Sequence, residues 1–404
     1  MSVLLLLAAC APAVTDVAPH QGRDEPAEDP VDEPGEDPVY EPVEALHFEQ
    51  RGALERGEME LLHAAPDLDG DGLRELIFLD GEDLLYVPLQ ADLSLGEPSR
   101  LPYGQRALTR VMLSSTGGRV SAWDVEATDA GDLDGDGDDE LILQVWIGIE
   151  GGSVTTACGT FAYDDEGWSL LRQTSDSTCT PIQMLADADG DGGAELLVHD
   201  PANWSLLYSR GYREPVTLTS GILGSVYRAH SHLLYLNSDD LPELVSFPDA
   251  GYGFAGGGYA VGSAYSDYAL QPYGVFIHGY TTASERGNAR PDEMMLLDSS
   301  GEIWWLGAGV DAPTMITEPT AGAWYGLFGQ LDGVRGLDAL FLGDTPRAYA
   351  GDGSGGLTEL GLELTLEDGE IFTSDLDGDG LDDLVLDHWG VDAGVQVWRN
   401  TSQD

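Results

Sequence analysis

Short apolar runs recur along the chain, and each directly follows an acidic residue. Counted between those acidic residues, the repeat spacing is 45 to 65 residues. Such short runs, in a chain with 53 glycines, are typical of β-strands rather than helices. The runs are LIFL (76–79), LILQVW (141–146), LLVHD (196–200), LVSF (244–247), MMLLD (294–298), ALFL (339–342) and LVLD (384–387).

Most of these runs are followed by a turn and a second apolar stretch, as in GEDLLYVPL, SGEIWWL and AGVQVWRN. Long stretches of helical periodicity are sparse, so the sequence predicts an all-β fold. Seven repeats of about 50 residues, each a small antiparallel sheet, are typical of a radial β-propeller. We therefore expect residues 46–404 to form one seven-bladed β-propeller.

The last repeat is too short to complete its own sheet. After its acidic loop only DLVLDHW and GVQVWRN remain, which supply two strands. Residues 46–63 contain apolar material that could complete it. We predict that the two ends of the domain share one blade, because this closes the ring without an open sheet edge.

An acidic loop precedes each apolar run, and its first copy covers residues 67–75. Oxygens come from Asp67, Asp69, Asp71, the carbonyl of Leu73, and Glu75, at positions 1, 3, 5, 7 and 9. A hard cation that accepts six or more oxygens in flexible geometry suits this set, which favours Ca²⁺ over Mg²⁺. Glycines at positions 4 and 6 allow the tight turn. Without a cation, the crowded carboxylates would repel one another.

Three further copies keep the whole pattern, so we predict about four bound Ca²⁺ ions. Their residues are Asp132, Asp134, Asp136, the Asp138 carbonyl and Glu140; Asp187, Asp189, Asp191, the Gly193 carbonyl and Glu195; and Asp375, Asp377, Asp379, the Leu381 carbonyl and Asp383. The other copies are eroded: the fourth keeps Asn237, Asp239 and Glu243 but has Tyr235 at position 1, the fifth keeps Glu285 and Glu293, and the sixth keeps Asp332 and Asp338. For these three, turns stabilised by Asp and Asn without metal are the alternative.

The string GDLDGDGDDELIL and its relatives resemble the FG-GAP and VCBS-type repeats of integrin-α-like seven-bladed propellers. The resemblance covers residues 46–404, strongly in four repeats and weakly in three. It implies that Asp-rich hairpin loops bind structural Ca²⁺. The loop differs from an EF-hand, in which the bidentate acid stands at position 12 rather than 9.

The N-terminus MSVLLLLAAC resembles the signal peptide of a bacterial lipoprotein, with a lipobox that ends at Cys10. The resemblance implies that residues 1–10 direct export and that Cys10 carries a lipid; a plain secretory signal or a chance apolar start is the alternative. Residues 11–45 are rich in Pro, Asp and Glu, which predicts a disordered acidic tether to the cell envelope or cell surface. Export also favours a disulfide between Cys158 and Cys179.

The chain has 17 arginines, no lysine and a formal charge of −56. This charge argues against nucleic acid and anionic lipid, so a lipid anchor is the one membrane contact expected. The missing lysine excludes Schiff-base and P-loop lysine enzymes.

No catalytic constellation is evident, so we expect a monomeric, non-enzymatic protein-interaction or adhesion module. A lectin-like sugar binder is the alternative, with Trp304, Trp305, Trp324 and Tyr325 as a stacking platform. A polysaccharide-processing enzyme is the third hypothesis. The ligand, protein or glycan, is not identified by the sequence.

Overall fold

The computed structural model describes the chain from residue 42 onward, with gaps. Residues 1–41 lie outside the described part, so the signal peptide, the lipidation of Cys10 and the tether stay predictions. The described residues are 42–55, 57, 59–102, 104–116, 118–151, 155–164, 167–174, 179, 182–185, 193–198, 206–208, 216–217, 229–234, 243–248, 279–284, 293–298, 303–307, 314–317, 323–334, 336–343, 346–364, 369–388 and 394–403.

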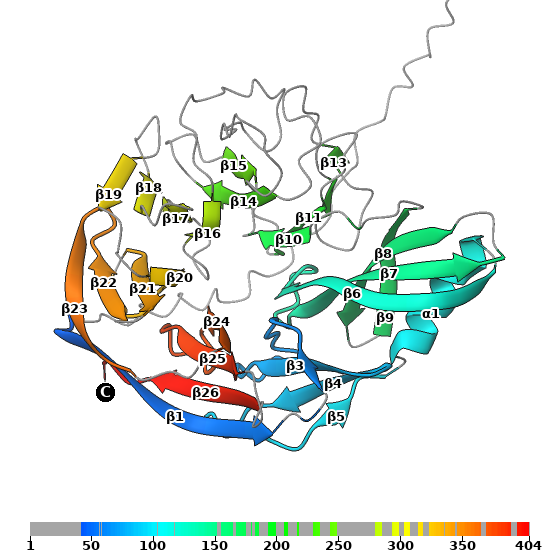
Figure 1. The fold of residues 1–404 in the computed structure, drawn as a ribbon, viewed down its shortest axis with the longest axis horizontal. Helices are drawn as coiled ribbons and strands as arrows, with labels where there is room; N and C mark the ends of the chain where they lie inside the picture. The colour runs from blue at the N-terminus through cyan, green and yellow to red at the C-terminus, as the bar shows by residue number, and fades with distance from the viewer. Residues whose placement is uncertain are drawn as a thin grey trace, which may run out of the picture. The chain divides into compact units, whose positions relative to one another are not determined.

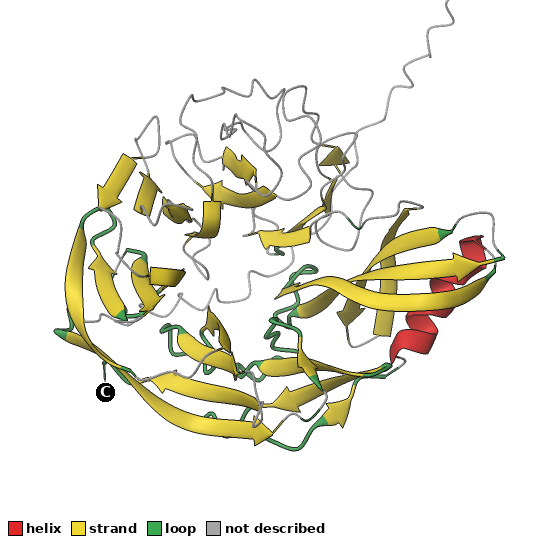
Figure 2. Cartoon of the chain, viewed as in Figure 1, coloured by secondary structure: helices red, strands yellow, loops and turns green. Residues whose placement is uncertain are grey.

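The fold is mostly β, and consecutive strands pair antiparallel within small sheets (Figures 1 and 2). Four sheets have four described strands each, in chain order. They are β2 (Glu60–Leu61), β3 (Glu75–Asp80), β4 (Asp83–Pro88) and β5 (Ser99–Arg100); β6 (Arg119–Gly131), β7 (Glu140–Glu150), β8 (Thr156–Asp164) and β9 (Gly167–Thr174); β10 (Ile182–Leu185), β11 (Glu195–Val198), β12 (Leu206–Tyr208) and β13 (Val216–Thr217); and β16 (Gly279–Ser284), β17 (Glu293–Asp298), β18 (Ile303–Gly307) and β19 (Thr314–Thr317). A two-stranded sheet holds β14 (Ala229–Leu234) and β15 (Glu243–Pro248).

The remaining strands form an eight-stranded sheet that joins the two ends of the described chain. Its order is β20-β21-β22-β23-β1-β26-β25-β24. The strands are β1 (Ala45–Glu55), β20 (Ala323–Gly329), β21 (Asp338–Gly343), β22 (Arg347–Gly351), β23 (Leu357–Glu363), β24 (Gly369–Ser374), β25 (Asp383–His388) and β26 (Gly394–Asn400). Strand β1 pairs antiparallel with β26, as Figure 1 also shows, and parallel with β23. The prediction that both ends share one sheet is therefore confirmed.

The predicted apolar runs lie in the second strand of each four-stranded group, directly after the acidic loop. In β3 and β25 five consecutive residues are buried, and in β7 the first six are. A strand covered on both faces needs apolar residues at every position, which explains why these strands appear in the sequence as continuous runs. The position-9 carboxylate of each loop begins the strand.

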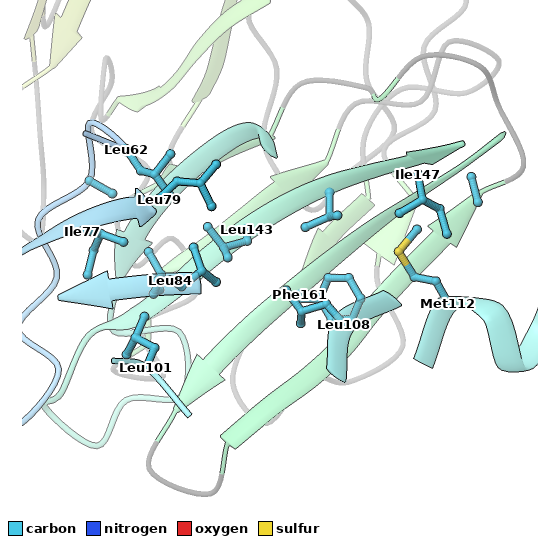
Figure 3. Packing of buried hydrophobic residues seen from close by; sticks show 14 of the residues in the cluster. Leu62, Ile77, Leu79, Leu84, Leu101, Leu108, Met112, Leu143, Ile147 and Phe161 are labelled. Carbon is cyan, nitrogen blue, oxygen red and sulfur yellow. The ribbon is translucent and has the colours of Figure 1, made fainter. Parts of the chain in front are cut away.

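Helix α1 (Gly104–Thr116) is an element that the sequence analysis did not predict. Leu108 and Met112, one helical turn apart, are completely buried in a cluster that includes Ile147 and Phe161 (Figure 3). The same cluster contains Leu62 and Ile77 of the preceding sheet, so neighbouring sheets share a core. Leu108, Val111 and Met112 have helical spacing in the sequence, but the helix is a single short element between strand repeats.

Cys158 and Cys179 form a disulfide, with their Cα atoms 5.4 Å apart. Among the described residues, no helix has the length and apolar character needed to cross a membrane.

Candidate metal centres in the acidic loops

The first, second and seventh acidic loops (67–75, 132–140 and 375–383) share one hydrogen-bond frame. The position-1 carboxylate of each, from Asp67, Asp132 and Asp375, accepts the backbone N–H groups of positions 5 and 6 at 2.9–3.1 Å. The position-5 carboxylate accepts the N–H of position 7 at 2.9–3.0 Å. Three loops far apart in sequence thus fold alike because the same short-range side chains direct the backbone.

Glycines at positions 4 and 6 permit this frame. Gly70 and Gly72 have φ of 66° and 85°, and Gly378 and Gly380 have φ of 71° and 86°. A Cβ atom disfavours this left-handed region, so the glycines are required by the backbone path. The curled backbone leaves the remaining carboxylates on one side of the loop.

Each of the three loops gathers three carboxylates whose oxygens lie within 4.8 Å of one another. In the first two loops these are positions 1, 3 and 5, namely Asp67, Asp69 and Asp71, and Asp132, Asp134 and Asp136. In the seventh loop they are Asp375, Asp377 and Asp383. The Oδ1 atom of Asp377 is buried and has no hydrogen-bond partner. Such an acceptor is costly unless a cation or donor meets it, so the residues present fit a hard divalent ion.

The position-9 carboxylate is buried in every described copy. Glu75, Glu140, Glu195 and Asp383 are at most 3% exposed. In the first, second and seventh loops it accepts the position-2 N–H at 2.5–3.1 Å. Burial, with a smaller contribution from the neighbouring aspartates, raises the pKa of Glu75 to about 7 and of Glu140 and Asp383 to about 8. A cation beside them would reverse this preference for the neutral form.

The third loop (187–195) is described only at its end. Glu195 is completely buried at the start of β11, and Gly193 packs against the backbone of Leu133 in the second loop. The predicted ligands Asp187, Asp189 and Asp191 lie outside the described residues, as do Tyr235, Asn237 and Asp239 of the fourth loop and Glu285 of the fifth.

The sixth loop (330–338) closes on itself through an amide. Gln330 stands at position 1, and its Nε2 donates to the position-7 carbonyl of Gly336 at 2.9 Å. In the intact loops this carbonyl is a predicted metal ligand. Asp332 and Asp338 are both buried, and burial raises the pKa of each. The alternative of a metal-free turn is therefore the better interpretation of this copy.

In the fifth copy an indole N–H donates to the position-9 carboxylate, Glu293. Trp305 Nε1 donates to Glu293 Oε2 at 2.6 Å, and the Leu337 N–H donates to the other oxygen at 2.5 Å. Trp305 is 7% exposed and belongs to a hydrophobic cluster. It is core, so the sugar-stacking platform cannot include it. The side chains of Trp324 and Tyr325 lie outside what the structure describes.

Position 8 connects five of the loops to the one before it in the described structure, a role that the sequence analysis missed. Its backbone N–H donates to the preceding loop in five places, at 2.5–3.1 Å: Arg74 to Leu376, Asp139 to Asp67, Ala194 to Asp132, Leu337 to Glu293, and Asp382 to Gln330. The Asp139 and Asp382 carboxylates also accept the position-1 N–H of the preceding loop. The acidic loops therefore form a connected series.

Arg74 adds a cation to this series. Its Nη1 lies 2.6 Å from Asp139 Oδ2 in the second loop, and its Nε donates to the Asp375 carbonyl of the seventh at 2.9 Å. One side chain thus links three loops. Replacing a buried partner in such a network would leave several polar groups unsatisfied.

A cavity of about 540 Å³ lies among β2, β6, β24 and β25. Its lining includes the carboxylates of Glu60, Glu126, Glu370 and Asp387, and His63 is the one basic side chain. Nε2 of His63 lies 3.3 Å from Glu370 Oε2. The negative charge disfavours anionic ligands at this position.

The fold is similar to solved structures of the β-propeller-like class. A lectin from Agrocybe aegerita, described as recognising non-reducing terminal N-acetylglucosamine, aligns with a TM-score of 0.50 and 15% identity over 82% of this chain and 90% of that chain. A chain from the crystal structure of BBS1N in complex with ARL6DN aligns with a TM-score of 0.48 and 9% identity over 90% and 93%. A chain of the mitotic checkpoint complex aligns with a TM-score of 0.49 and 12% identity over 81% and 87%.

The likeness to the lectin, together with the antiparallel four-stranded sheets, defines the class of this protein as a β-propeller-like fold. No known family model and no curated protein matches the sequence. FG-GAP or VCBS membership therefore stays a prediction that the loop motifs alone support.

Proposed function

We propose that this protein is a calcium-stabilised, seven-bladed β-propeller of the FG-GAP/VCBS type that serves as a protein-interaction or adhesion module. The single observation that carries the proposal is the shared frame of the first, second and seventh loops. Each frame holds three carboxylates within 4.8 Å, and the seventh adds the unpartnered Oδ1 of Asp377. Carboxylates this close repel one another, and a bound cation would offset that repulsion.

The metal in this proposal is structural. Positions 1, 3, 5 and 9 and the position-7 carbonyl would hold it, and the ion would supply positive charge without taking part in a reaction. Modules outside the cell bind Ca²⁺ with dissociation constants of about 10⁻⁴ to 10⁻³ M. Millimolar calcium would then stabilise each site by about 0.5 to 1.5 kcal/mol. Because position 8 connects successive loops, ordering one loop supports its neighbours.

The binding role rests on the propeller-like class and on charge. An exported module with a net charge of −56 favours basic or neutral ligands over anionic ones. A protein partner with exposed arginine or lysine suits the carboxylate-lined cavity better than an acidic glycan does. The lectin-like alternative is weakened because Trp305 is buried, and it now depends on Trp304, Trp324 and Tyr325.

Calorimetry with calcium on the mature chain tests the metal part of the proposal. We expect about four binding sites and a melting temperature that falls when calcium is chelated. A protein that binds no calcium at millimolar concentration, and melts at the same temperature in chelator, would refute it. For the binding role, capture from the native envelope and a glycan array should be compared with and without calcium. Retention of a glycan rather than a protein would favour the lectin.

A further inference from the structure

We infer that Arg399 is a built-in cation of the seventh acidic loop, which competes with the metal there and makes this site weaker than those of the first and second loops. The inference rests on the proposed calcium function and specifies how one of its sites is tuned. Arg399 belongs to β26, the last strand before the C-terminus, and its position in the sequence gave no sign of this role.

The contacts of Arg399 are with two predicted metal ligands. Its Nε lies 2.8 Å from Asp377 Oδ2, and its Nη2 lies 3.1 Å from Asp379 Oδ2. These are positions 3 and 5 of the loop. The Asp377 side chain is 8% exposed and that of Arg399 is 24% exposed, so solvent screens the first pair only in part. The guanidinium thus already supplies part of the positive charge that the ion would bring.

The seventh loop differs from the first and second in which carboxylates lie close together, and the contact between Arg399 and Asp379 accounts for the difference. In the first and second loops the close carboxylates are positions 1, 3 and 5. In the seventh loop position 5 is absent from the close group, and position 9 replaces it. The Asp379 carboxylate instead bonds to Arg399 and to the N–H of Leu381. The Oδ1 atom of Asp377 still has no partner, so a metal retains a binding position there.

Strand register places a different residue at this position in the first and second loops. Glu75 of the first loop pairs with Pro88. In the second sheet Leu141 pairs with Tyr163, which places Asp164 opposite Glu140. In the last sheet Leu384 pairs with Trp398, which places Arg399 opposite Asp383. The residue opposite position 9 is therefore a proline in the first loop, an aspartate in the second and an arginine in the seventh.

The charge at this position predicts an order of affinity. Calcium affinity in oxygen sites rises with the negative charge of the ligand set. The register of β7 and β8 places the Asp164 carboxylate beside the second loop, which adds a negative charge there. We therefore expect the second site to bind most tightly, the first less tightly, and the seventh most weakly.

The location of Arg399 gives this weakness a structural consequence. Strand β26 pairs with β1 along the junction between the two ends of the domain, where Glu49 pairs with Arg399 itself. A loop that keeps its own cation holds this junction together when calcium is low. In the described contacts Arg74 pairs with Asp139 at position 8 and no guanidinium pairs with the predicted ligand carboxylates of the first and second loops, so we expect these loops to loosen first.

Calcium titration of the mature chain by calorimetry tests the inference, with Arg399→Gln as the variant. Glutamine removes the positive charge and keeps a polar side chain. We expect the seventh site to bind calcium at least about tenfold more tightly, because the positive charge of Arg399 that repels the ion is gone. Arg399→Lys should keep the site weak. Arg100→Gln is the matched control, since Arg100 pairs only with the exposed Asp83 in the described structure and is 71% exposed.

A second measurement keeps the test sound if Arg399→Gln folds poorly without metal. Asp164 accepts the Gly167 N–H at 2.9 Å, and the amide oxygen in Asp164→Asn can keep this bond. Because the variant removes a negative charge beside the second loop, it should weaken calcium binding there. Unchanged affinities in both variants, with calcium still bound, would overturn the inference and leave the proposed function intact. Absence of calcium binding in the parent protein would instead overturn the proposed function and this inference together.

Discussion

Asp139 and Asp67 are joined by two hydrogen bonds that run in opposite directions. The Asp139 N–H donates to the Asp67 carbonyl at 2.7 Å, and the Asp139 carboxylate accepts the Asp67 N–H at 3.1 Å. Asp382 and Gln330 repeat the arrangement, at 2.6 and 2.8 Å. Position 8 is therefore the contact between these successive acidic loops.

Replacing Asp139 by alanine should destabilise the protein by about 1–3 kcal/mol, because the Arg74 guanidinium and the Asp67 N–H both lose an acceptor. Asp139→Asn should recover part of the loss by keeping an acceptor. Urea unfolding in saturating calcium measures the effect. Asp83→Ala removes an exposed pair with Arg100 and should change stability by less than about 0.5 kcal/mol. Equal effects of the two alanine variants would contradict the role of position 8.

Asp69→Asn should remove one calcium ion from the protein. Asp69 is exposed at position 3 of the first loop and belongs to its close carboxylate group. The substitution removes one ligand charge while the frame bonds made by Asp67 and Asp71 remain. Calorimetry should show one site fewer, with little change in chelated stability.

The control for this variant is Asp352→Asn. Asp352 accepts the N–H groups of Ser354 and Gly356 in a turn that we predict to be metal-free. Its calcium stoichiometry should match that of the parent. Loss of an ion in the control, or none in Asp69→Asn, would count against the assignment of the first loop.

Stability without calcium should fall as the pH rises from about 5 to about 8. Burial raises the folded-state pKa of Glu75 to about 7 and those of Glu140 and Asp383 to about 8. A carboxyl whose folded pKa is raised contributes stability that is complete below its unfolded pKa, near 4, and is lost as the pH rises through the folded value. The melting temperature in chelator should drop by several degrees over this range.

Saturating calcium should remove or reverse this slope, because the ion binds the deprotonated carboxylates. Thermal scans at pH 5, 6, 7 and 8, each with calcium and with chelator, provide the comparison. A flat profile in chelator would mean that these carboxyls titrate at ordinary values in the folded protein.

Trp305→Phe should lower stability by about 1–3 kcal/mol without changing calcium binding or any glycan binding. The variant removes the indole N–H from the buried Glu293 carboxylate and keeps an aromatic ring in the core. Trp304→Phe, at a partly exposed position of the same strand, should cost less. Selective loss of glycan binding in Trp305→Phe, with stability intact, would restore the lectin-like platform that includes this residue.

Several features of the fold could be predicted from the sequence because they depend on local patterns. The apolar runs in β3, β7 and β25 are continuous because both faces of these strands are buried. The closing pair of β1 and β26 followed from counting strands in the last repeat. Helix α1 was missed, because a single helix of 13 residues gives a short periodic signal between the repeated strand patterns.

The sequence by itself determined where the acidic loops lie, which copies are intact, and that glycines allow their turns. These properties depend on residues within nine positions of one another, so the motif contains them. Tertiary structure alone decided what each loop contacts. Arg74 meets Asp375 across 301 residues, Leu337 meets Glu293 across 44, and Arg399 meets Asp377 across 22. Such partners are selected by the packing of separate sheets, and no local pattern encodes which cation, amide or indole will arrive beside a given carboxylate.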